Sequence, residues 1–227
     1  MENEKHYRHE WKHIISPADL LTIRQRMRAV AKPDPHAKDG RYLIRSLYFD
    51  DMHDRALREK CDGVNMREKF RIRCYDLDPS MIFLEKKSKV NGLGTKYKAQ
   101  LTQDEVSDII RGDTDFMMEK EDPLIRELYC KMKNRGLRPK TIVDYTREPF
   151  IFGPGNVRVT LDHDIRTGLL ETDMLDKSCV TVSAGEAFII LEVKWDAYLP
   201  DIIRDAVQLT NCRSTAFSKY AQCRIYG

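Results

Sequence analysis

Basic residues alternate with apolar residues along one short segment of this chain. In residues 68–75, Lys69, Arg71 and Arg73 share one parity, whereas Phe70 and Ile72 occupy the other. Successive side chains of a β-strand point to opposite faces, so this spacing places the three cations together on one face. Guanidinium groups bind phosphate oxygens through paired hydrogen bonds. The segment therefore predicts a strand with a phosphate-binding face.

Related alternation recurs elsewhere in the chain, in segments 5–14, 81–87, 95–101, 141–147, 157–162 and 187–195. The cations of the ionic parity are Arg8, Lys12, Lys69, Arg71, Arg73, Lys87, Lys96, Lys98, Arg147, Arg158 and Lys194. The carboxylates of the same parity are Glu10, Glu85, Asp162 and Glu192. These groups sum to +7, although the whole chain carries only +3 at pH 7. Segment 42–50 is also strand-like, but its two faces are not cleanly separated.

Such an excess of positive charge on one sheet face calls for a counter-charge, because like charges on neighbouring strands repel. If the sheet closes with this face inward, the cations converge in a low-dielectric interior and require a polyanion. A chain of phosphates fits that need, and the carboxylates provide oxygen ligands suited to Mg²⁺ or Mn²⁺. Three alternatives remain: an ordinary half-buried sheet with a solvated polar face, surface charge on an edge strand for Arg71 and Arg73, and a simple cross-strand ion pair for Glu192 and Lys194.

The elements that must position these residues are mostly strands, with four helices predicted from capping patterns and apolar spacing. The expected helices run from Ser16 to about Val30, from Thr102 to Gly112, from Asp122 to Gly136 and from Pro200 to Val207. About eight strands joined mainly by short connections indicate an α+β protein, built as an eight-stranded antiparallel β-barrel with flanking helices. The loops are too short to be interdomain linkers, so residues 1–227 are expected to form one domain.

Composition excludes several classes of protein. A chain of 227 residues with 33% charged residues but a net charge of only +3 is unlike a general nucleic-acid coat protein, whose affinity comes from many phosphate contacts. No apolar run reaches the roughly 18–20 residues that a membrane span needs, and the first twelve residues are too polar for a signal peptide. The six cysteines form no C-x-x-C pair and are expected to be reduced thiols, as in a cytoplasmic protein.

Eight short motifs, in order along nearly the whole chain, resemble one known family. They are Arg8-His9-Glu10-Trp11-Lys12, Arg45-Ser46-Leu47-Tyr48-Phe49-Asp50, Arg71-Ile72-Arg73-Cys74-Tyr75, Leu84-Glu85-Lys86-Lys87, Leu137-Arg138-Pro139 with Tyr145-Thr146-Arg147, Arg158-Val159-Thr160-Leu161-Asp162, Leu191-Glu192-Val193-Lys194 and Ser218-Lys219-Tyr220. The chain resembles the VTC domain, the polyphosphate polymerase module of the vacuolar transporter chaperone complex and its bacterial relatives. That domain is grouped with the CYTH proteins among the triphosphate tunnel metalloenzymes.

The resemblance implies a tunnel whose inner basic residues bind a nucleoside triphosphate or polyphosphate. It assigns catalytic roles to Arg71, Arg73, Lys87 and Lys194, and phosphate binding to Lys12, Lys98, Arg147, Arg158 and Lys219. It assigns Glu192 to an Mn²⁺ or Mg²⁺ ion, with Glu10, Glu85 and Asp162 as further candidates. The first-strand motif is Arg-x-Glu-x-Lys, not the Glu-x-Glu-x-Lys of the CYTH branch, which argues against two-metal triphosphate hydrolysis.

The activity that the resemblance implies is metal-dependent phosphoryl transfer from ATP to a growing inorganic polyphosphate chain. Hydrolysis of a triphosphate or nucleotide is the second hypothesis, and a non-catalytic polyphosphate- or nucleotide-binding module is the third. No nucleic-acid partner is expected, and the residues indicate neither an oligomeric state nor a protein partner. Two assignments are less direct: Lys86 lies on a parity that is otherwise apolar, and Lys219 could instead belong to a packed terminal helix.

Overall fold

The computed structural model describes residues 8–91, 93–209 and 215–225. Its α-helices are α1 (Pro17–Val30), α2 (Arg55–Cys61), α3 (Gln103–Arg111), α4 (Pro123–Arg135), α5 (Asp201–Val207) and α6 (Lys219–Cys223). Short 3₁₀ turns are η1 (Lys38–Gly40), η2 (Asp115–Met118) and η3 (Pro154–Asn156). None of the helices in the described part is long and apolar enough to cross a membrane.

The strands are β1 (His9–Ile15), β2 (Lys32–Pro33), β3 (Tyr42–Asp50), β4 (Arg67–Tyr75), β5 (Phe83–Val90), β6 (Leu93–Gln100), β7 (Arg138–Phe152), β8 (Val157–Thr167), β9 (Val182–Ser183) and β10 (Ile189–Trp195). Eight of them follow the hydrogen-bonded order β1-β10-β8-β7-β3-β4-β5-β6, with β2 beside β7 and β9 beside β8. The ladders that define the site strands are antiparallel. This sheet with flanking helices confirms the predicted α+β class.

Backbone contacts group the chain into two compact units. The first unit comprises Met1–Leu43, Tyr145–Ile165 and Gly185–Phe217, and the second comprises Ile44–Asp144, Arg166–Ala184 and Ser218–Gly227. The division passes through strands β3, β7 and β8, so each unit is described separately below. The expectation that the chain is one domain stays a prediction.

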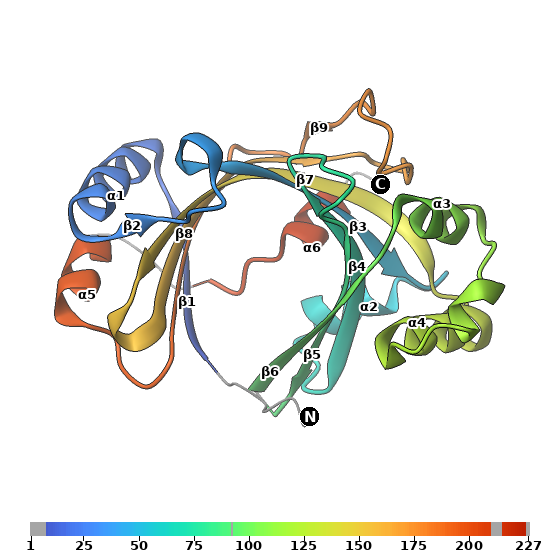
Figure 1. The fold of residues 1–227 in the computed structure, drawn as a ribbon. Helices are drawn as coiled ribbons and strands as arrows, with labels where there is room; N and C mark the ends of the chain where they lie inside the picture. Colours follow the sequence, from blue (N-terminus) through green and yellow to red (C-terminus); the bar gives the residue numbers. More distant parts are fainter. Residues whose placement is uncertain (1–7, 92, 210–214, 226–227) are drawn as a thin grey trace. The chain divides into compact units, whose positions relative to one another are not determined.

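In the first unit, helices α1 and α5 cover the apolar face of β1, β8 and β10 (Figure 1). Ile23 and Met27 of α1 and Ile203 of α5 are fully buried against Val159 and Val193 of the strands. Helix α1 begins where the sequence predicts, because the Ser16 side chain accepts a hydrogen bond from the Asp19 backbone in a capping box. The opposite, ionic parity of these strands is therefore left for the candidate site.

In the second unit, helices α3 and α4 pack on the apolar face of β4 to β6 (Figure 1). Phe70, Ile72 and Leu84 from the strands and Val106 and Leu128 from the helices are buried in one core. The predicted parity of β4 is thus confirmed, since Phe70 and Ile72 point to the helices and Arg71 and Arg73 point away from them. The helices fix which face of the sheet can bind a ligand.

The predicted elements all exist, with shifted ends. The predicted first strand extends over residues 5–7, which lie outside the described residues, and its described part is β1. Sequence analysis missed α2, whose N-cap Asp54 has a left-handed backbone (φ 52°) and makes no side-chain cap. It also missed the two-residue strands β2 and β9. All three lack the apolar periodicity that makes an element visible in sequence. The five cysteines of the described part are free thiols, and Cys212 lies outside it.

The capping box of α3 provides a direct stability test. Thr102 accepts a hydrogen bond from the Glu105 backbone at 3.2 Å, and the Glu105 carboxylate accepts one from the Thr102 backbone at 2.8 Å. Replacing Thr102 with Ala removes one of these bonds and is expected to lower the free energy of unfolding by about 1 kcal/mol. Urea unfolding measures the change. The exposed neighbour Gln103→Ala is the control and should change stability by less than half as much.

Candidate functional site

Three strands of the second unit carry rows of cations in register across the face opposite α3 and α4. One row joins Lys69 of β4 to Lys87 of β5 and then to Lys96 of β6. The next row joins Arg71, Glu85 and Lys98 in the same order. Neighbouring strands lie about 4.8 Å apart. We call the side chains of this face on β4, β5 and β6 the cation face.

The cation face holds many cations and one carboxylate. Its basic residues are Arg67, Lys69, Arg71, Arg73, Lys87, Lys89, Lys96 and Lys98, and its carboxylate is Glu85. Arg67 and Lys89 pair in register next to the lysine row, and sequence analysis missed them because the alternation was read only from Lys69 onward and up to Lys87. Like charges that face each other across strands repel, so these rows destabilise the sheet unless negative charge lies nearby.

Glu85 is the centre of the cation face. Its Oε2 accepts hydrogen bonds from Arg71 Nε at 2.8 Å and Nη2 at 2.5 Å, and Arg73 Nη1 lies 3.8 Å from the same atom. Its Oε1 lies 2.5 Å from Lys96 Nζ. Glu85 is 1% exposed, so one buried carboxylate is shared by three cations. Lys98 lies on the same face, with its Nζ 3.4 Å from the centroid of the Phe83 ring.

The pKa shifts at Glu85 and Lys96 follow from this sharing. Burial by itself would raise the pKa of Glu85, but Arg71, Arg73 and Lys96 outweigh it and hold this pKa well below its usual range. Burial lowers the pKa of Lys96, and the positive charges of Arg71 and Arg73 lower it further against the opposing effect of Glu85. Glu85 therefore stays ionised among these cations.

Strand β3 contributes hydroxyl groups to the arginines of the second unit. Arg71 Nη1 donates a hydrogen bond to Tyr48 Oη at 2.7 Å, and Arg73 Nε donates one to Ser46 Oγ at 3.2 Å. Tyr48 and Ser46 are the register partners of Arg71 and Arg73. Both residues lie in the motif Arg45–Asp50, but sequence analysis assigned them no role. Their only chemical signal was a hydroxyl at alternate positions, within a strand that is buried on both faces.

Lys86 lies on the other face of β5, which resolves its unexpected parity. Its Nζ forms an ion pair with Glu68 at 3.1 Å and a shorter one with Glu127 of α4, and it lies over the Phe70 ring. Lys86 thus lies at the edge of the apolar face, beside the helix layer, where the two glutamates neutralise its charge. It has no place on the cation face.

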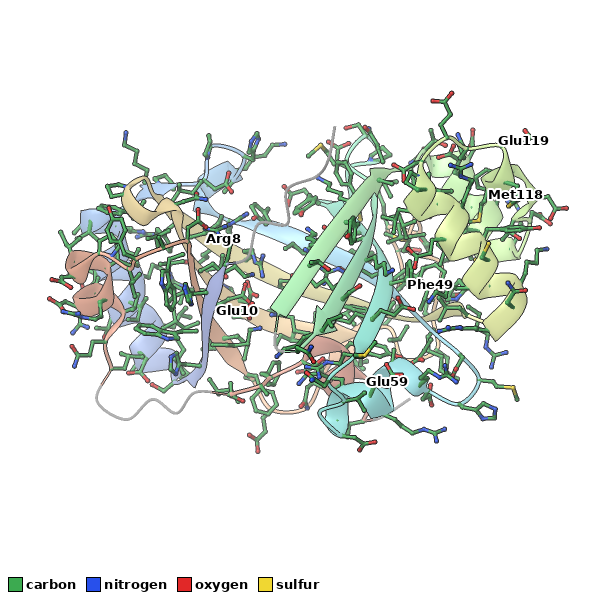
Figure 2. The ribbon with its side chains drawn as sticks, turned by 90° about the horizontal axis from the view of Figure 1, so that it is seen from below. Arg8, Glu10, Phe49, Glu59, Met118 and Glu119 are labelled. Atoms are coloured by element: carbon green, nitrogen blue, oxygen red, sulfur yellow. The ribbon has the colours of Figure 1, made fainter. Side chains whose placement is uncertain are left out.

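The first unit brings together four of the predicted residues on β1 and β10. Lys12 Nζ lies 2.5 Å from Glu10 Oε1 and 3.1 Å from Glu192 Oε2, and Lys194 forms a close ion pair with Glu192. Figure 2 marks Glu10 beside β1. The cross-strand ion pair considered for Glu192 is therefore present, between Glu192 and Lys12. Burial works against the charged form of Lys12, but Glu192 and Glu10 outweigh it and raise the pKa of Lys12, so this residue stays positive.

Two arginines of the first unit have counter-ions of their own. Arg147 donates from Nε and Nη2 to the two carboxylate oxygens of Asp162, at 2.6 and 2.7 Å. Arg158 donates from Nη2 to Tyr42 Oη at 2.7 Å and to Asp34 Oδ2 at 3.2 Å. Both arginines of the first unit are thus balanced by nearby carboxylates.

The four predicted metal ligands do not form one cluster. Glu10 and Glu192 share Lys12, Asp162 binds Arg147, and Glu85 binds the cations of β4 and β6. Within the described ranges, no three His, Cys, Asp or Glu side chains are placed to hold a metal ion by themselves. Mg²⁺ and Mn²⁺ are often held by one or two carboxylates together with substrate phosphates. Glu10 and Glu192 fit that smaller donor set.

Lys219 is the first residue of α6, and the packed terminal helix considered for this segment is present. Ser218 caps the helix by accepting a hydrogen bond from the Ala221 backbone, and Tyr220 is buried against the second unit. Lys219 is half-buried. Its assignment to phosphate binding stays a prediction.

The antiparallel sheet carries the cation face on one side and helices on the other, and the comparison with protein families makes the classification specific. The model of the VTC domain family matches residues 7–225. The chain belongs to the VTC domain family. This membership places it among domains related to nucleotides or polyphosphate, as the sequence motifs imply.

Solved structures with similar folds are distant in sequence. The PH1819 protein of Pyrococcus horikoshii OT3 is 15% identical with a TM-score of 0.44, over 88% of this chain and 84% of that one. A "putative adenylate cyclase" of Bacillus halodurans is 13% identical with a TM-score of 0.47, over 83% and 80%. The PH1012 protein of P. horikoshii OT3 is 11% identical with a TM-score of 0.43, over 88% and 85%. No curated protein matches the chain.

Proposed function

We propose that this protein transfers the γ-phosphoryl group of ATP to the end of a growing inorganic polyphosphate chain. The observation that supports the proposal most is the cation face, on which the described side chains of β4, β5 and β6 comprise eight basic residues and one carboxylate, Glu85. A phosphate chain carries repeated negative charge and can contact successive rows of such a face. Membership of the VTC domain family supports the same substrate class.

In the proposed reaction, the bond between the γ-phosphorus and the oxygen that leaves with ADP breaks. A new bond forms to a terminal oxygen of the acceptor phosphate chain. Arg71 and Arg73 bind non-bridging oxygens of the transferred group through fixed guanidinium donors, and Lys87 and Lys98 bind neighbouring phosphates. The rate enhancement comes from positioning and from electrostatic stabilisation of charge on the transferred group, so no covalent protein intermediate is needed.

Residues of the first unit have a related role in the proposal. Lys12, Lys194, Arg147 and Arg158 bind further phosphate oxygens, and Lys219 of the second unit is assigned the same role. Glu192, with Glu10, would hold Mn²⁺ or Mg²⁺, which supplies charge neutralisation for the phosphate oxygens when bound. Lys12 and Lys194 contact both carboxylates and orient them.

Incubation of the full chain with ATP and Mn²⁺ tests the proposal against its alternatives. The expected products are ADP and acid-insoluble phosphate chains, and removal of Mn²⁺ by a chelator should stop both. Free phosphate without chains would instead establish the hydrolase. Binding of ATP without turnover would establish a non-catalytic module. Absence of binding to both ATP and inorganic tripolyphosphate would overturn every phosphate-based function for this chain.

A further inference from the structure

A stack of two tyrosine rings connects Arg71 to the C-terminal helix within the second unit. The rings of Tyr48 and Tyr220 lie 4.8 Å apart at an interplanar angle of 20°. Tyr48 accepts the hydrogen bond from Arg71 Nη1, and Tyr220 comes from α6. Figure 1 shows α6 on the opposite side of these strands from α3 and α4, which is the side of the cation face.

The Tyr220 end of the stack is tightly anchored. Tyr220 Oη donates a hydrogen bond to Asp50 Oδ2 at 2.7 Å. Asp50 also accepts from the backbone amides of Ala56 at 2.9 Å and Leu57 at 3.1 Å, at the beginning of α2. Burial and the neighbouring Asp50 charge raise the pKa of Tyr220, so its hydroxyl remains a donor. The ring of Tyr220 therefore has a fixed position.

Helix α6 is held by two further contacts. Arg224 donates from Nη1 and Nη2 to the carboxylate oxygens of Asp54, at 2.9 and 3.2 Å. Gln222 Nε2 donates to the Ala184 backbone oxygen at 3.0 Å. All partners lie in the second unit, and Tyr220 and Tyr48 are 1% and 3% exposed. Helix α6 thus holds the ring of Tyr220 in a fixed position against Tyr48.

Tyr48 also differs chemically from the other partner of Arg71. Glu85 neutralises charge, whereas a phenol oxygen accepts a hydrogen bond without cancelling the guanidinium charge. Lys69 Nζ and Arg71 Cζ each lie 5.6 Å from the centroid of the Tyr48 ring, within the range of cation–π attraction. One ring therefore contacts two cations of adjacent rows.

We propose that Tyr48, held in place by Tyr220, is a positioning residue that sets the orientation of the Arg71 guanidinium for phosphate binding. The identity of the ligand in this inference rests on the proposed function, whereas the orientation of the Arg71 guanidinium does not depend on it. The Tyr48 hydroxyl fixes one Nη donor of Arg71 while Glu85 holds the Nε edge. The guanidinium plane is thereby fixed before the phosphate arrives, which lowers the conformational cost of binding.

A double-mutant cycle on the full chain tests this role, with inorganic tripolyphosphate as the probe in isothermal titration calorimetry. Tyr48→Phe removes only the hydroxyl and is expected to weaken binding about tenfold in the wild-type background. In an Arg71→Lys background the same change should weaken binding less than twofold, because lysine lacks the planar fork that Tyr48 orients. Equal losses in the two backgrounds would overturn the inference. Tyr97→Phe, on the opposite face of β6, is the matched control and should leave affinity unchanged.

NMR spectroscopy of the ligand-free protein tests whether the Arg71 guanidinium has a fixed orientation. In wild type, the Arg71 guanidinium should give resolved, slowly exchanging NH signals by NMR, because its two edges are held. Tyr48→Phe, and Tyr220→Leu which removes the stacked ring, should both average these signals. Unchanged signals in both variants would refute the positioning role. If wild type fails to bind tripolyphosphate but the signals respond as expected, the proposed function fails and the positioning role stands.

Discussion

Replacing Arg71 with Ala is expected to reduce ATP-dependent phosphoryl transfer by about 100- to 1000-fold, the usual cost of removing one fixed donor to developing charge. Arg71 is 7% exposed and makes paired bonds to Glu85 together with the bond to Tyr48. Its guanidinium is thus ordered before substrate binds, and alanine leaves no donor at this position. Initial rates of ADP formation at saturating ATP measure the loss.

Arg28→Ala is the control for this prediction. Arg28 is exposed on α1, and this helix packs on the apolar face of its strands, opposite the ionic face. Its activity should stay within about twofold of wild type. Thermal unfolding of both variants shows whether a loss reflects the fold, since Arg71→Ala also removes a partner of Glu85. Similar losses from Arg28→Ala and Arg71→Ala, with both variants folded, would mean that the phosphate-binding face has been misassigned.

Much of the fold and of the charged face could be predicted from residue parity. Helix capping at Ser16 and Thr102 located two helix starts, because a cap depends on residues that are adjacent in sequence. Alternation placed Arg71 and Arg73 on the face opposite Phe70 and Ile72, because each strand packs helices against only one of its faces. These features are local, and local chemistry is visible in a single sequence.

The counter-ions could not be predicted in the same way. Whether Glu85 serves Arg71 and Lys96 depends on strand order and register, and those follow from contacts between distant segments. The net charge of +7 counted over one parity of the sequence made no distinction between cations that contact a carboxylate and cations that do not. In the structure, Lys12, Lys194 and Arg147 contact carboxylates, and eight basic residues share one face of β4, β5 and β6. Which carboxylate each cation contacts is thus a property of the tertiary structure.

The hydroxyl partners on β3 were hidden for a different reason. Almost every residue of β3 is buried, so the strand shows no apolar and polar alternation. Ser46 and Tyr48 face Arg73 and Arg71, while Leu47 and Phe49 face the core under the helices. The sequence of a strand that is buried on both faces shows no alternation of apolar and polar residues. Its functional side chains can then be recognised only from the residues that they contact in the folded structure.

The second large effect is expected from Glu85→Gln, which keeps the size of the side chain but removes the charge that Arg71, Arg73 and Lys96 share. Breaking a buried ion pair by neutralising one partner typically costs about 3–5 kcal/mol, because the remaining charges lose their counter-ion. Urea unfolding at pH 7 should show a loss of this size. Glu127→Gln is the matched control: Glu127 pairs with Lys86 at the edge of the helix layer and should cost less than about 1 kcal/mol.

The pH dependence of this difference has a defined sign. The folded-state pKa of Glu85 lies below its value in the unfolded chain, so its contribution is fully present above about pH 4.3 and is lost as the pH falls toward the folded pKa. The stabilities of wild type and Glu85→Gln should therefore converge in acid. Tripolyphosphate should raise the unfolding temperature of the variant more than that of wild type, because phosphate oxygens replace the missing carboxylate. A variant as stable as wild type at pH 7, with no added response to tripolyphosphate, would show that Glu85 is not the counter-ion of the cation face.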